Sequence, residues 1–558
     1  MKAELVLANG TVYDPANGIA GERMDICIRE GKIVERVSEG AQRLDLAGKV
    51  VMPGGVDVHT HVTGSKVNAG RIMRPEDVRS NVSPRTPLTR SASGFTVPNV
   101  YQIGYTYARM GYTTLVEAAV PPLKARHTHE ELSAIPILDK ASLVLMGNNW
   151  LIMKYLSEGR DDLLREYVAW LLEAAKGYGI KIVNPGGTEA WGWGRNVEGV
   201  RDKVPHFGIT PAEIIKGLLQ ANEGLNLPTS VHLHANRLGK PGNYSTTLET
   251  MELVRNATTR MPRGQVLHVV HLQFHSYGGD GWRNFRSEAD KVAAAVNSSS
   301  NITVDAGAVV FGWSTTMTAD GPFEHDLQRL THLKWTNADV EAETGAGVVP
   351  HFYSMKNAVS VVQWCTGLEL LLLIKPDRIF LTTDHPNAGS FSKYPQIIHL
   401  LMSRKYRDAM MEKLNPVCKK SVLASLDREY TLYDIVKITR AGTAKALGLL
   451  QKGHLAPGAD ADVAVYDLKP DSTEGLEKAL SSAHLVLKDG TTVVRDGRIL
   501  AAPIGRTYWV KCPPTSKRDE MIDGLREHFR YYTIQLGNYP ASEEHLMRSS
   551  PVVPEVSS

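Results

Sequence analysis

The sequence predicts an α/β protein built on a TIM (β/α)8 barrel, with a small β-sandwich formed by the N- and C-terminal segments. Short apolar runs alternate with helical stretches of ten or more residues through the middle of the 558-residue chain, as in repeated βα units. Eight of these runs qualify as strands, and eight parallel strands close such a barrel. Runs of alternating apolar and polar residues, broken by turn dipeptides, occur near both ends of the chain.

The eight predicted barrel strands are rich in β-branched and other apolar residues, as strands buried on both faces are. In chain order they cover residues 50–61, 113–118, 142–149, 179–185, 230–236, 265–274, 301–309 and 378–386. We expect their carboxyl ends to form one face of the barrel, which is where the active sites of such barrels lie.

The chain outside the barrel divides into three segments. Residues 1–52 and 441–512 share short strands and turn dipeptides, so we expect them to form the two parts of the sandwich around a barrel of residues 53–440. Residues 513–558 form a C-terminal tail that contains the aromatic, amphipathic segment REHFRYYTIQLGNYP. Exposed aromatic residues are typical of interfaces, so we expect this tail to dock on a partner protein rather than to fold back on its own barrel.

The charge and cysteine content exclude several classes of protein. Lys and Arg total 63 against 60 for Asp and Glu, and a net charge of +3 gives no field suited to nucleic acid or an anionic membrane. The four cysteines lie far apart, which excludes an iron–sulfur site built from them and favours a cytoplasmic location. The densest apolar stretch, 368–374, is far shorter than the roughly 20 residues of a membrane span, so we expect neither a span nor a secretion signal.

The first predicted strand ends in Asp57-Val58-His59-Thr60-His61. Because residues i and i+2 of a strand face the same side, His59 and His61 can present two imidazoles to one metal ion. A His-x-His pair alone is weak evidence, since half-buried histidines with ordinary hydrogen bonds are common. Other predicted strands strengthen the metal hypothesis.

Further potential ligands lie at the ends of those strands. They are Lys181 in the fourth, His232 and His234 in the fifth, His268 and His271 in the sixth, and Asp384 after the eighth. Each has an ordinary structural explanation when taken alone; Lys181, for example, can be a surface lysine. Their convergence on the active face of one barrel is hard to attribute to packing.

This order of motifs resembles the amidohydrolase superfamily of metal-dependent hydrolases, over the barrel and both flanking segments. GGVDVHTH is similar to its first-strand motif, and PGADADVAVYD followed by KDGTTVVRDGRIL is similar to its C-terminal sandwich. The resemblance implies a binuclear centre of two Zn²⁺ ions. The implied ligands are His59 and His61 for one metal, His234 and His271 for the other, Lys181 as a bridging N6-carboxylysine, and Asp384 completing the first site.

Two of these ligands have alternatives. His234 is preferred because the sequence HAN at 234–236 lies where the superfamily usually has His-Ala-Glu, and His232 is its fallback. His271 is preferred over His268 and His275 because its position before a leucine matches. Within such a centre, Asp384 accepts a proton from water and passes it to the leaving amine, which is the chemistry of C–N bond hydrolysis.

A more specific resemblance covers nearly the whole chain. GSKVNAGRIMRPED (64–77), IKIVNPGGTEAWGWG (180–194), HLQFHSYGG (271–279) and TTDHPNAGSFSKYP (382–395) are similar to the A subunits of formylmethanofuran dehydrogenase and of the formyltransferase/hydrolase complex. The resemblance implies interconversion of N-formylmethanofuran and water with formate and methanofuran, in methanogenesis or methylotrophy. It also implies that the B, C and D subunits of such a complex are partners. The chain has no clustered redox ligands, so any electron transfer belongs to those partners.

The insertion from Val62 to Pro98 follows the first strand and holds six Lys and Arg residues against two acidic ones. Methanofuran of this family carries a glutamate-rich tail, so we expect Arg71, Arg74 and Arg79 to hold the tail, with Asn184 near the mouth of the site. A solvated or partner-facing loop is the alternative for this insertion.

Two other functions are compatible with the barrel. One is a freestanding cyclic amidohydrolase of the dihydroorotase or dihydropyrimidinase kind, with the same metals and a small cyclic substrate. The other is a catalytically inactive scaffold within a complex. Retention of all six metal-site residues argues against the scaffold. Formate release from formylmethanofuran, without activity on cyclic imides, would separate the expected function from the cyclic amidohydrolase.

Overall fold

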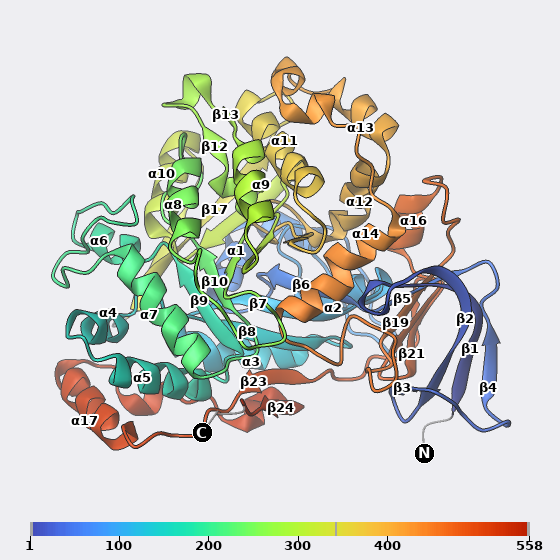
Figure 1. The fold of residues 1–558 in the computed structure, drawn as a ribbon, viewed down its shortest axis with the longest axis horizontal. Helices are drawn as coiled ribbons and strands as arrows, with labels where there is room; N and C mark the ends of the chain where they lie inside the picture. Colours follow the sequence, from blue (N-terminus) through green and yellow to red (C-terminus); the bar gives the residue numbers. More distant parts are fainter. Residues whose placement is uncertain (1–3, 341–342, 555–558) are drawn as a thin grey trace.

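Each of the eight predicted segments contributes a strand to one parallel sheet (Figure 1), but the first, 50–61, is divided: Val50–Pro53 pairs in a separate sheet, and only Gly55–Thr60 belongs to the barrel. The computed structural model describes residues 4–340 and 343–554. In sheet order the strands are β6 (Gly55–Thr60), β7 (Tyr112–Val120), β8 (Asp139–Leu145), β9 (Gly179–Val183), β10 (Val231–His234), β11 (Leu267–Val269), β14 (Ile302–Asp305) and β18 (Ile379–Phe380). An isolated parallel bridge between Thr60 and His385 brings the first strand against the last, so the ring of strands is nearly closed.

Burial on both faces explains why these segments form one parallel sheet. All nine residues of β7 and all five of β9 are buried, as expected for strands with a packed interior and an outer layer of helices. The main helices of that layer are α2 (Val100–Arg109), α3 (Ala125–Ala134), α5 (Asp161–Ala174), α7 (Pro211–Gly224), α8 (Tyr244–Glu252), α9 (Ala289–Ser298), α11 (Ala358–Leu373) and α12 (Tyr394–Met402). Helix α7 begins with a capping box between Thr210 and Glu213. Among the described helices, none combines the length and apolar character that crossing a membrane requires.

The two ends of the chain share a sheet beside the barrel, on the right of Figure 1. Within the described residues its strands are β1 (Leu5–Asp14), β2 (Ile19–Arg29), β3 (Lys32–Val34), β4 (Gln42–Asp45) and β5 (Val50–Pro53), with β19 (Val463–Tyr466), β20 (Leu485–Lys488), β21 (Thr491–Arg495) and β22 (Arg498–Ile499). Strands β5 and β19 pair in antiparallel register, which joins the two segments as expected. Apolar side chains from both segments form a separate small core.

One strand assigned to the sandwich lies elsewhere. Strand β23 (Thr507–Val510) pairs in parallel with the first residues of β8, at Lys140 and Ala141, and so extends the barrel sheet. The neighbouring barrel strand β9 pairs only with the later residues of β8, from Leu143 onward, which leaves that edge of β8 open to β23. The last strand of the predicted sandwich therefore belongs to the base of the barrel.

The C-terminal tail packs on its own barrel. The expectation that it would not fold back on the barrel is therefore wrong. Helix α17 (Arg518–His528) lies against α5, and β24 (Ser549–Val552) pairs in parallel with β23. The ring of His528 stacks on Trp150 at 4.7 Å, and Arg518 pairs with the buried carboxylate of Glu166. The aromatic face of the tail thus covers apolar surface of the barrel helices.

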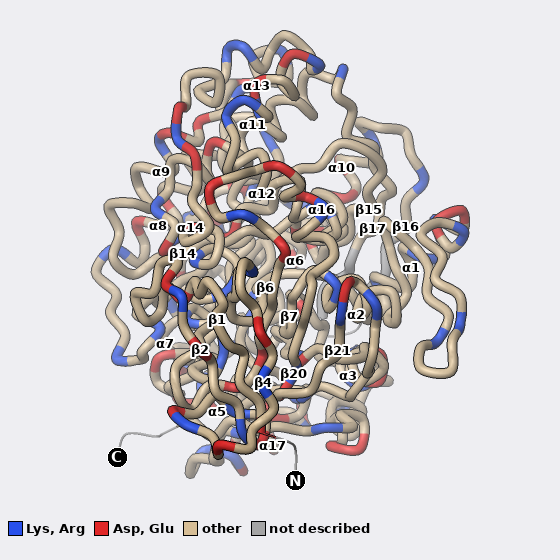
Figure 2. Tube along the Cα trace, turned by 90° about the vertical axis from the view of Figure 1, so that its right-hand side faces the viewer, with Lys and Arg blue, Asp and Glu red and all other residues tan. Residues whose placement is uncertain are grey.

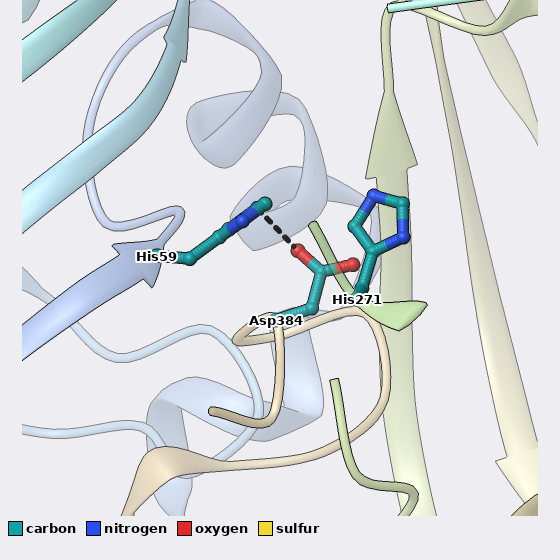
Figure 3. A group of neighbouring side chains, drawn as sticks. All are labelled: His59, His271 and Asp384. Carbon is teal, nitrogen blue, oxygen red and sulfur yellow. Dashed lines mark ion pairs between the residues drawn. The ribbon is translucent and has the colours of Figure 1, made fainter. Parts of the chain in front are cut away.

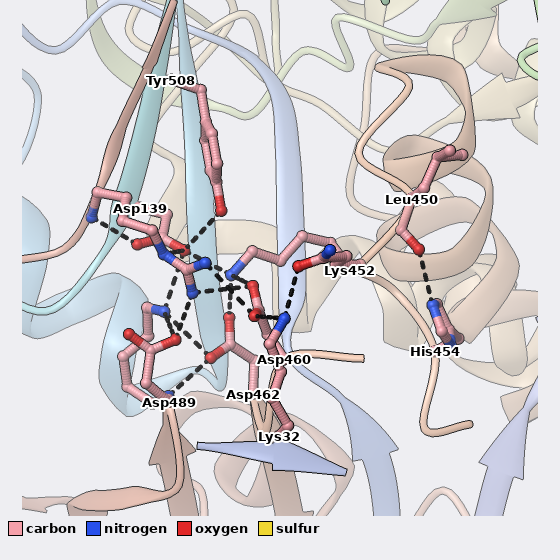
Figure 4. A network of polar contacts seen from close by, with 12 residues as sticks. Lys32, Asp139, Leu450, Lys452, His454, Asp460, Asp462, Asp489 and Tyr508 are labelled. Carbon is pink, nitrogen blue, oxygen red and sulfur yellow. Dashed lines mark hydrogen bonds and ion pairs between the residues drawn. The ribbon is translucent and has the colours of Figure 1, made fainter. Parts of the chain in front are cut away.

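A buried network of charges joins the terminal sheet to the base of β8 (Figure 4). The carboxylate of Asp139 lies 3.0 Å from Nζ of Lys488 and also pairs with Lys452. Lys452 in turn lies 2.8 Å from Asp460 and 2.6 Å from Asp462. Burial alone raises the pKa of Asp139, but Lys452 and Lys488 lower it by more, and the net pKa lies well below the usual range.

Two segments lie at the C-terminal end of the barrel. The sequence predicts no strand or helix in either of them, but both contain regular structure. The insertion after β6 forms helix α1 (Ser65–Met73) and a short helical turn, Pro75–Arg79. In the described chain, β15 (Gly312–Thr318), β16 (Thr336–Val340) and β17 (Glu343–Tyr353) form a small antiparallel sheet with α10 (Gly321–Thr331) beside it. Of these elements, β15, α10 and β17 supply residues to the wall of the cavity at the barrel mouth.

We expect Asp139→Asn to lower the free energy of unfolding by about 3–5 kcal/mol, because it removes one of the two carboxylates that buried Lys452 and Lys488 share and leaves the buried network with excess positive charge. The folded pKa of Asp139 is depressed, so its contribution is present above the unfolded pKa and is lost as pH falls through the folded pKa. Urea unfolding at several pH values measures both effects. The control is Asp496→Asn, which changes an exposed aspartate that pairs with half-buried His484; an equal loss in the control contradicts the prediction.

Candidate metal centre

A cavity of about 1070 Å³ opens at the carboxyl ends of the barrel strands. All six predicted metal-site side chains line it: His59, His61, Lys181, His234, His271 and Asp384. They come from strands one, four, five, six and eight or from the residues that directly follow, so the barrel itself brings together positions more than 300 residues apart. Asn184 does not line this cavity.

The carboxylate of Asp384 lies between the histidines of the first strand. Its Oδ1 is 3.0 Å from Nε2 of His59 and 3.2 Å from Nε2 of His61. His59, His271 and Asp384 offer ligand atoms that all lie within 4.8 Å of one another (Figure 3). Burial raises the pKa of Asp384, but His271 and His59 lower it to well below the usual range, so the carboxylate is ionised at neutral pH.

Two further carboxylates orient the histidines of β6. Oδ2 of Asp305, at the end of β14, is 3.2 Å from Nδ1 of His59. Oε1 of Glu117, in β7, is 3.3 Å from Nδ1 of His61, and its other oxygen accepts the backbone N–H of Val62 at 2.8 Å. A carboxylate on the far nitrogen fixes the ring and leaves Nε2 for a cation.

His234 is oriented in a similar way by Asp320, which follows β15 and caps the N-terminus of α10. Oδ2 of Asp320 lies 3.1 Å from Nε2 of His234, and the amide of Asn184 donates to Oδ1 of the same aspartate at 3.0 Å. Asn184 therefore acts through Asp320 rather than at the mouth of the cavity. The alternative ligand His232 lies deeper, packed on His268 with ring centroids 4.5 Å apart, and does not line the cavity.

Lys181 is a buried lysine with no ion pair at its ammonium position within the described residues. It is 1% exposed, and its Nζ has no hydrogen-bond partner in that part of the chain. Burial lowers the pKa of Lys181 to about 7, although Asp384 and Asp305 act in the opposite direction. A large fraction of this side chain is therefore a neutral amine near pH 7, which is the nucleophilic form.

The residues present fit a pair of divalent cations. Nζ of Lys181 and Nδ1 of His271 are buried and have no hydrogen-bond partner within the described residues, and Oδ1 of Asp384 has only the two imidazoles of His59 and His61 beside it. Buried polar atoms are almost always partnered, so the two unpartnered nitrogens in one cavity point to a missing ligand. Imidazole and carboxylate donors suit zinc and similar ions.

The arginines of the insertion have partners away from the cavity. Nη2 of Arg71 donates to the carbonyl oxygens of Val62 and Pro98, both at 3.0 Å. The guanidinium of Arg74 lies 4.3 Å from the centroid of Trp313, and Arg79 is exposed. None of the three lines the cavity, because the insertion folds as a helix whose arginines satisfy nearby carbonyls and rings.

Besides Lys181, the Lys and Arg residues that line the cavity are Arg237, Lys240 and Arg329. Lys240 lies 2.8 Å from Glu198 and 3.4 Å from Asp326, and both of these acids also line the cavity. Arg71, Arg74 and Arg79 lie outside the lining of the cavity, so recognition of an anionic tail by these arginines stays a prediction. The cavity rim carries mixed charge.

Sequence reasoning missed three carboxylates of this site: Asp305, Glu117 and Asp320. Asp305 and Glu117 lie within predicted strands, in NITVDAGAV and TTLVEA, so the rule that found the histidines also points to them. Asp320 follows β15, a strand that was not predicted, and the sequence around it gives no comparable signal.

This barrel, its terminal sheet and its cluster of histidines, lysine and aspartate define a metal-dependent hydrolase. The chain belongs to the amidohydrolase family, whose model matches residues 42–494. The fold also matches N-acyl-D-glutamate deacylase of Bordetella bronchiseptica, at 16% identity over 90% of this chain and 99% of that one with a TM-score of 0.50, which supports the fold alone.

Two relatives are much more similar. The chain is 51% identical to the protein FwdA of Methanocaldococcus jannaschii, over 97% of both chains. It is 38% identical to the A subunit of the formyltransferase/hydrolase complex Fhc of Methylorubrum extorquens, over 89% of both. The crystal structure of that complex, FhcABCD with methylofuran, contains a chain that matches this one with a TM-score of 0.90 and 34% identity, over 99% of this chain and 100% of that one. The resemblance found in the sequence is confirmed.

We expect Asp305→Asn and Glu117→Gln each to weaken zinc binding by about 10- to 100-fold, because each frees the orientation of one first-strand histidine. Titration of metal-free protein against a competing chelator measures the change. Glu369→Gln is the matched control, since Glu369 is a buried carboxylate that binds Ser287 and the N–H of Leu423 outside the cavity. Unchanged zinc affinity in the Asp305 and Glu117 variants would show that these carboxylates do not support the ligands.

Proposed function

We propose that this chain is the hydrolytic component of a formylmethanofuran dehydrogenase or formyltransferase/hydrolase complex, and that it interconverts N-formylmethanofuran and water with formate and methanofuran. The observation that carries the proposal is the convergence of His59, His61, Lys181, His234, His271 and Asp384 on one cavity in a chain similar throughout to FwdA and to its Fhc counterpart. The alternative of an inactive scaffold does not explain why this donor set is complete.

Two zinc ions are the cofactor that the donors support. His59, His61 and Asp384 would hold one ion, His234 and His271 would hold the other, and Lys181, once carboxylated, would supply anionic oxygens to both. When bound, such ions supply Lewis acidity that lowers the pKa of water and polarises a carbonyl. Two of these residues, Asp384 with φ of 46° and His271 with φ of 36°, have left-handed backbone conformations.

The bridging role of Lys181 requires a change of charge. A lysine ammonium repels cations, whereas its neutral amine attacks carbon dioxide, forms an N–C bond and loses a proton to give a carbamate. The carbamate offers two anionic oxygens in place of one cationic nitrogen. Burial of Lys181, which lowers its pKa to about 7, supplies the neutral amine that this reaction needs.

Asp384 is the proton carrier of the proposed reaction. Its ionised carboxylate takes a proton from the attacking water as the new C–O bond forms at the formyl carbon. It returns that proton to the nitrogen of methanofuran as the C–N bond breaks, so formate and the free amine result. The reverse sequence condenses formate with the amine.

The size and walls of the cavity favour an extended substrate over a small cyclic imide. A volume of about 1070 Å³ matches the upper range for cavities that hold drug-sized ligands. Trp282, Phe323, Leu330 and Phe352 form an apolar side of it. A substrate with an aromatic body can cover these side chains while its formamide reaches Asp384, whereas a single small ring leaves them in water.

Assembly with B, C and D subunits is part of the proposal, because the crystallised chain that matches this one over its full length belongs to a four-component complex. The four cysteines, Cys27, Cys365, Cys418 and Cys512, are all free thiols, which supports a reducing cytoplasmic location.

We expect Asp384→Asn to lower kcat for formate release from N-formylmethanofuran by about 10²- to 10⁴-fold, because the amide cannot accept the proton of water. An enzymatic formate assay on the purified complex measures the rate. The control is Asp280→Asn, an exposed aspartate of the same cavity, which should keep the wild-type rate. Ring opening of dihydroorotate or a hydantoin by the wild-type protein, without formate release from N-formylmethanofuran, would favour the cyclic amidohydrolase instead.

We expect ¹³C-labelled bicarbonate to produce a carbamate resonance in the wild-type protein that Lys181→Ala lacks, together with loss of the paired zinc ions. In metal-free protein, carbamate formation should fall about tenfold for each pH unit below about 7, because only the neutral amine reacts. The matched control is Lys140→Ala, which removes a buried lysine with a pKa of about 8 at the other end of the barrel. A carbamate signal that survives Lys181→Ala would remove Lys181 from its proposed role.

A further inference from the structure

Residues 78–92 form an exposed arm on the insertion after β6. Val78, Val82 and Leu88 are 58, 62 and 47% exposed, a concentration of unburied large apolar side chains within eleven residues. The arm begins within the turn Pro75–Arg79 that follows α1, and in Figure 2 the chain beside α1 lies at the edge of the molecule. Clustered exposed apolar residues mark interaction surfaces, whereas single ones do not.

The arm is ordered by its own hydrogen bonds. Ser83 and Ala92 exchange backbone hydrogen bonds of 2.7 and 2.9 Å, and the N–H of Thr86 donates to the carbonyl of Thr89 at 2.9 Å near the tip. At the base, the buried carboxylate of Asp77 accepts the N–H groups of Phe95 and Val97, both at 3.0 Å. A preformed arm loses less conformational entropy on docking than a flexible loop does.

The charge of the arm has one sign. It contains Arg79, Arg85 and Arg90, all exposed, and no Asp or Glu occurs from Val78 to Pro98. The rest of the chain is nearly neutral, since the net charge is +3 over all 558 residues. A surface that meets this arm must therefore combine an apolar centre with carboxylates around it.

Aromatic and cationic contacts connect the base of the arm to the cavity. The guanidinium of Arg74 lies 4.3 Å from the ring centroid of Trp313, which packs edge to face on Phe352 at 5.3 Å. Trp313 and Phe352 are themselves about half exposed, and Phe352 lines the cavity. A protein bound along this path lies beside the cavity mouth.

We propose that the arm docks in an acidic groove with an apolar centre on a companion subunit of the complex, and that it places this companion beside the cavity mouth. The inference rests on the proposed function, which supplies the companion subunits. It goes further by assigning the contact to residues 78–92 and by fixing the chemistry of the partner. In this proposal Arg79 contacts the companion subunit and does not bind substrate.

The test compares complexes isolated through an affinity tag on this chain. The triple variant Val78→Asp, Val82→Asp, Leu88→Asp should bind the B, C and D subunits, identified by their peptide masses, at least about tenfold more weakly than wild type does in native mass spectrometry titrations. Its zinc content and formate release should stay at the level of the isolated wild-type chain, because these residues lie outside the metal centre. The matched control places the same substitution at Met24, Leu450 and Leu500, exposed apolar residues on and near the terminal sheet.

The outcomes separate the arm from the proposed function. Loss of companions in the arm variant alone supports the assignment, and weaker binding of Arg85→Glu at low salt supports the acidic groove. Equal assembly of arm variant and wild type overturns the assignment while the function stands, as does equal loss in the control triple. A wild-type chain that binds no companion overturns both the assembly and the arm. A wild-type dimer that the arm triple dissociates overturns the companion in favour of a second copy.

Discussion

The position of one carboxylate controls the chemistry of this molecule. Asp384 lies in a closed environment of imidazoles, and its charge is stable there only because His59, His61 and His271 surround it. The same burial that makes an isolated charge costly makes the site a strong binder of cations, since the donors cannot satisfy one another completely. The carboxylates of Asp305 and Glu117 extend the arrangement outward by holding the histidines in place. The barrel positions all of these groups at one rim.

Much of the site follows from the rule that side chains at the carboxyl ends of barrel strands converge. His59, His61, Lys181, His234 and Asp384 were placed by that rule and by the order of the strands, and all five line the cavity. The sequence left His232 and His234 as alternatives because both face the barrel interior, two residues apart. His234 lies at the last residue of β10 and reaches the cavity, whereas His232 lies two residues deeper in the barrel. The residue at which β10 ends decides this difference, and residue type does not reveal it.

Other features escaped sequence reasoning because they depend on tertiary contacts. The tail after Pro513 has the amphipathic composition of an interface, and composition does not tell whether the covered surface belongs to the same chain. Arg71 and Arg74 have the charge expected for binding an anion. In the structure, however, Arg71 donates to a backbone carbonyl and Arg74 packs on the ring of Trp313. Strands β15 and β17 pair with each other in a small antiparallel sheet that is separate from the barrel. A pattern of eight parallel barrel strands therefore does not predict them.

The shared terminal sheet has a consequence for synthesis. Strand β5 pairs with β19, a segment about 400 residues later in the chain, so the N-terminal strands leave the ribosome long before their partner exists. At about 5–20 residues per second the delay is roughly 20 to 80 s. During that time the edge of β5 offers unpaired backbone groups to any other strand. Newly made chains are therefore most exposed to aggregation at their beginning, and translation speed and chaperone access set the yield of folded protein.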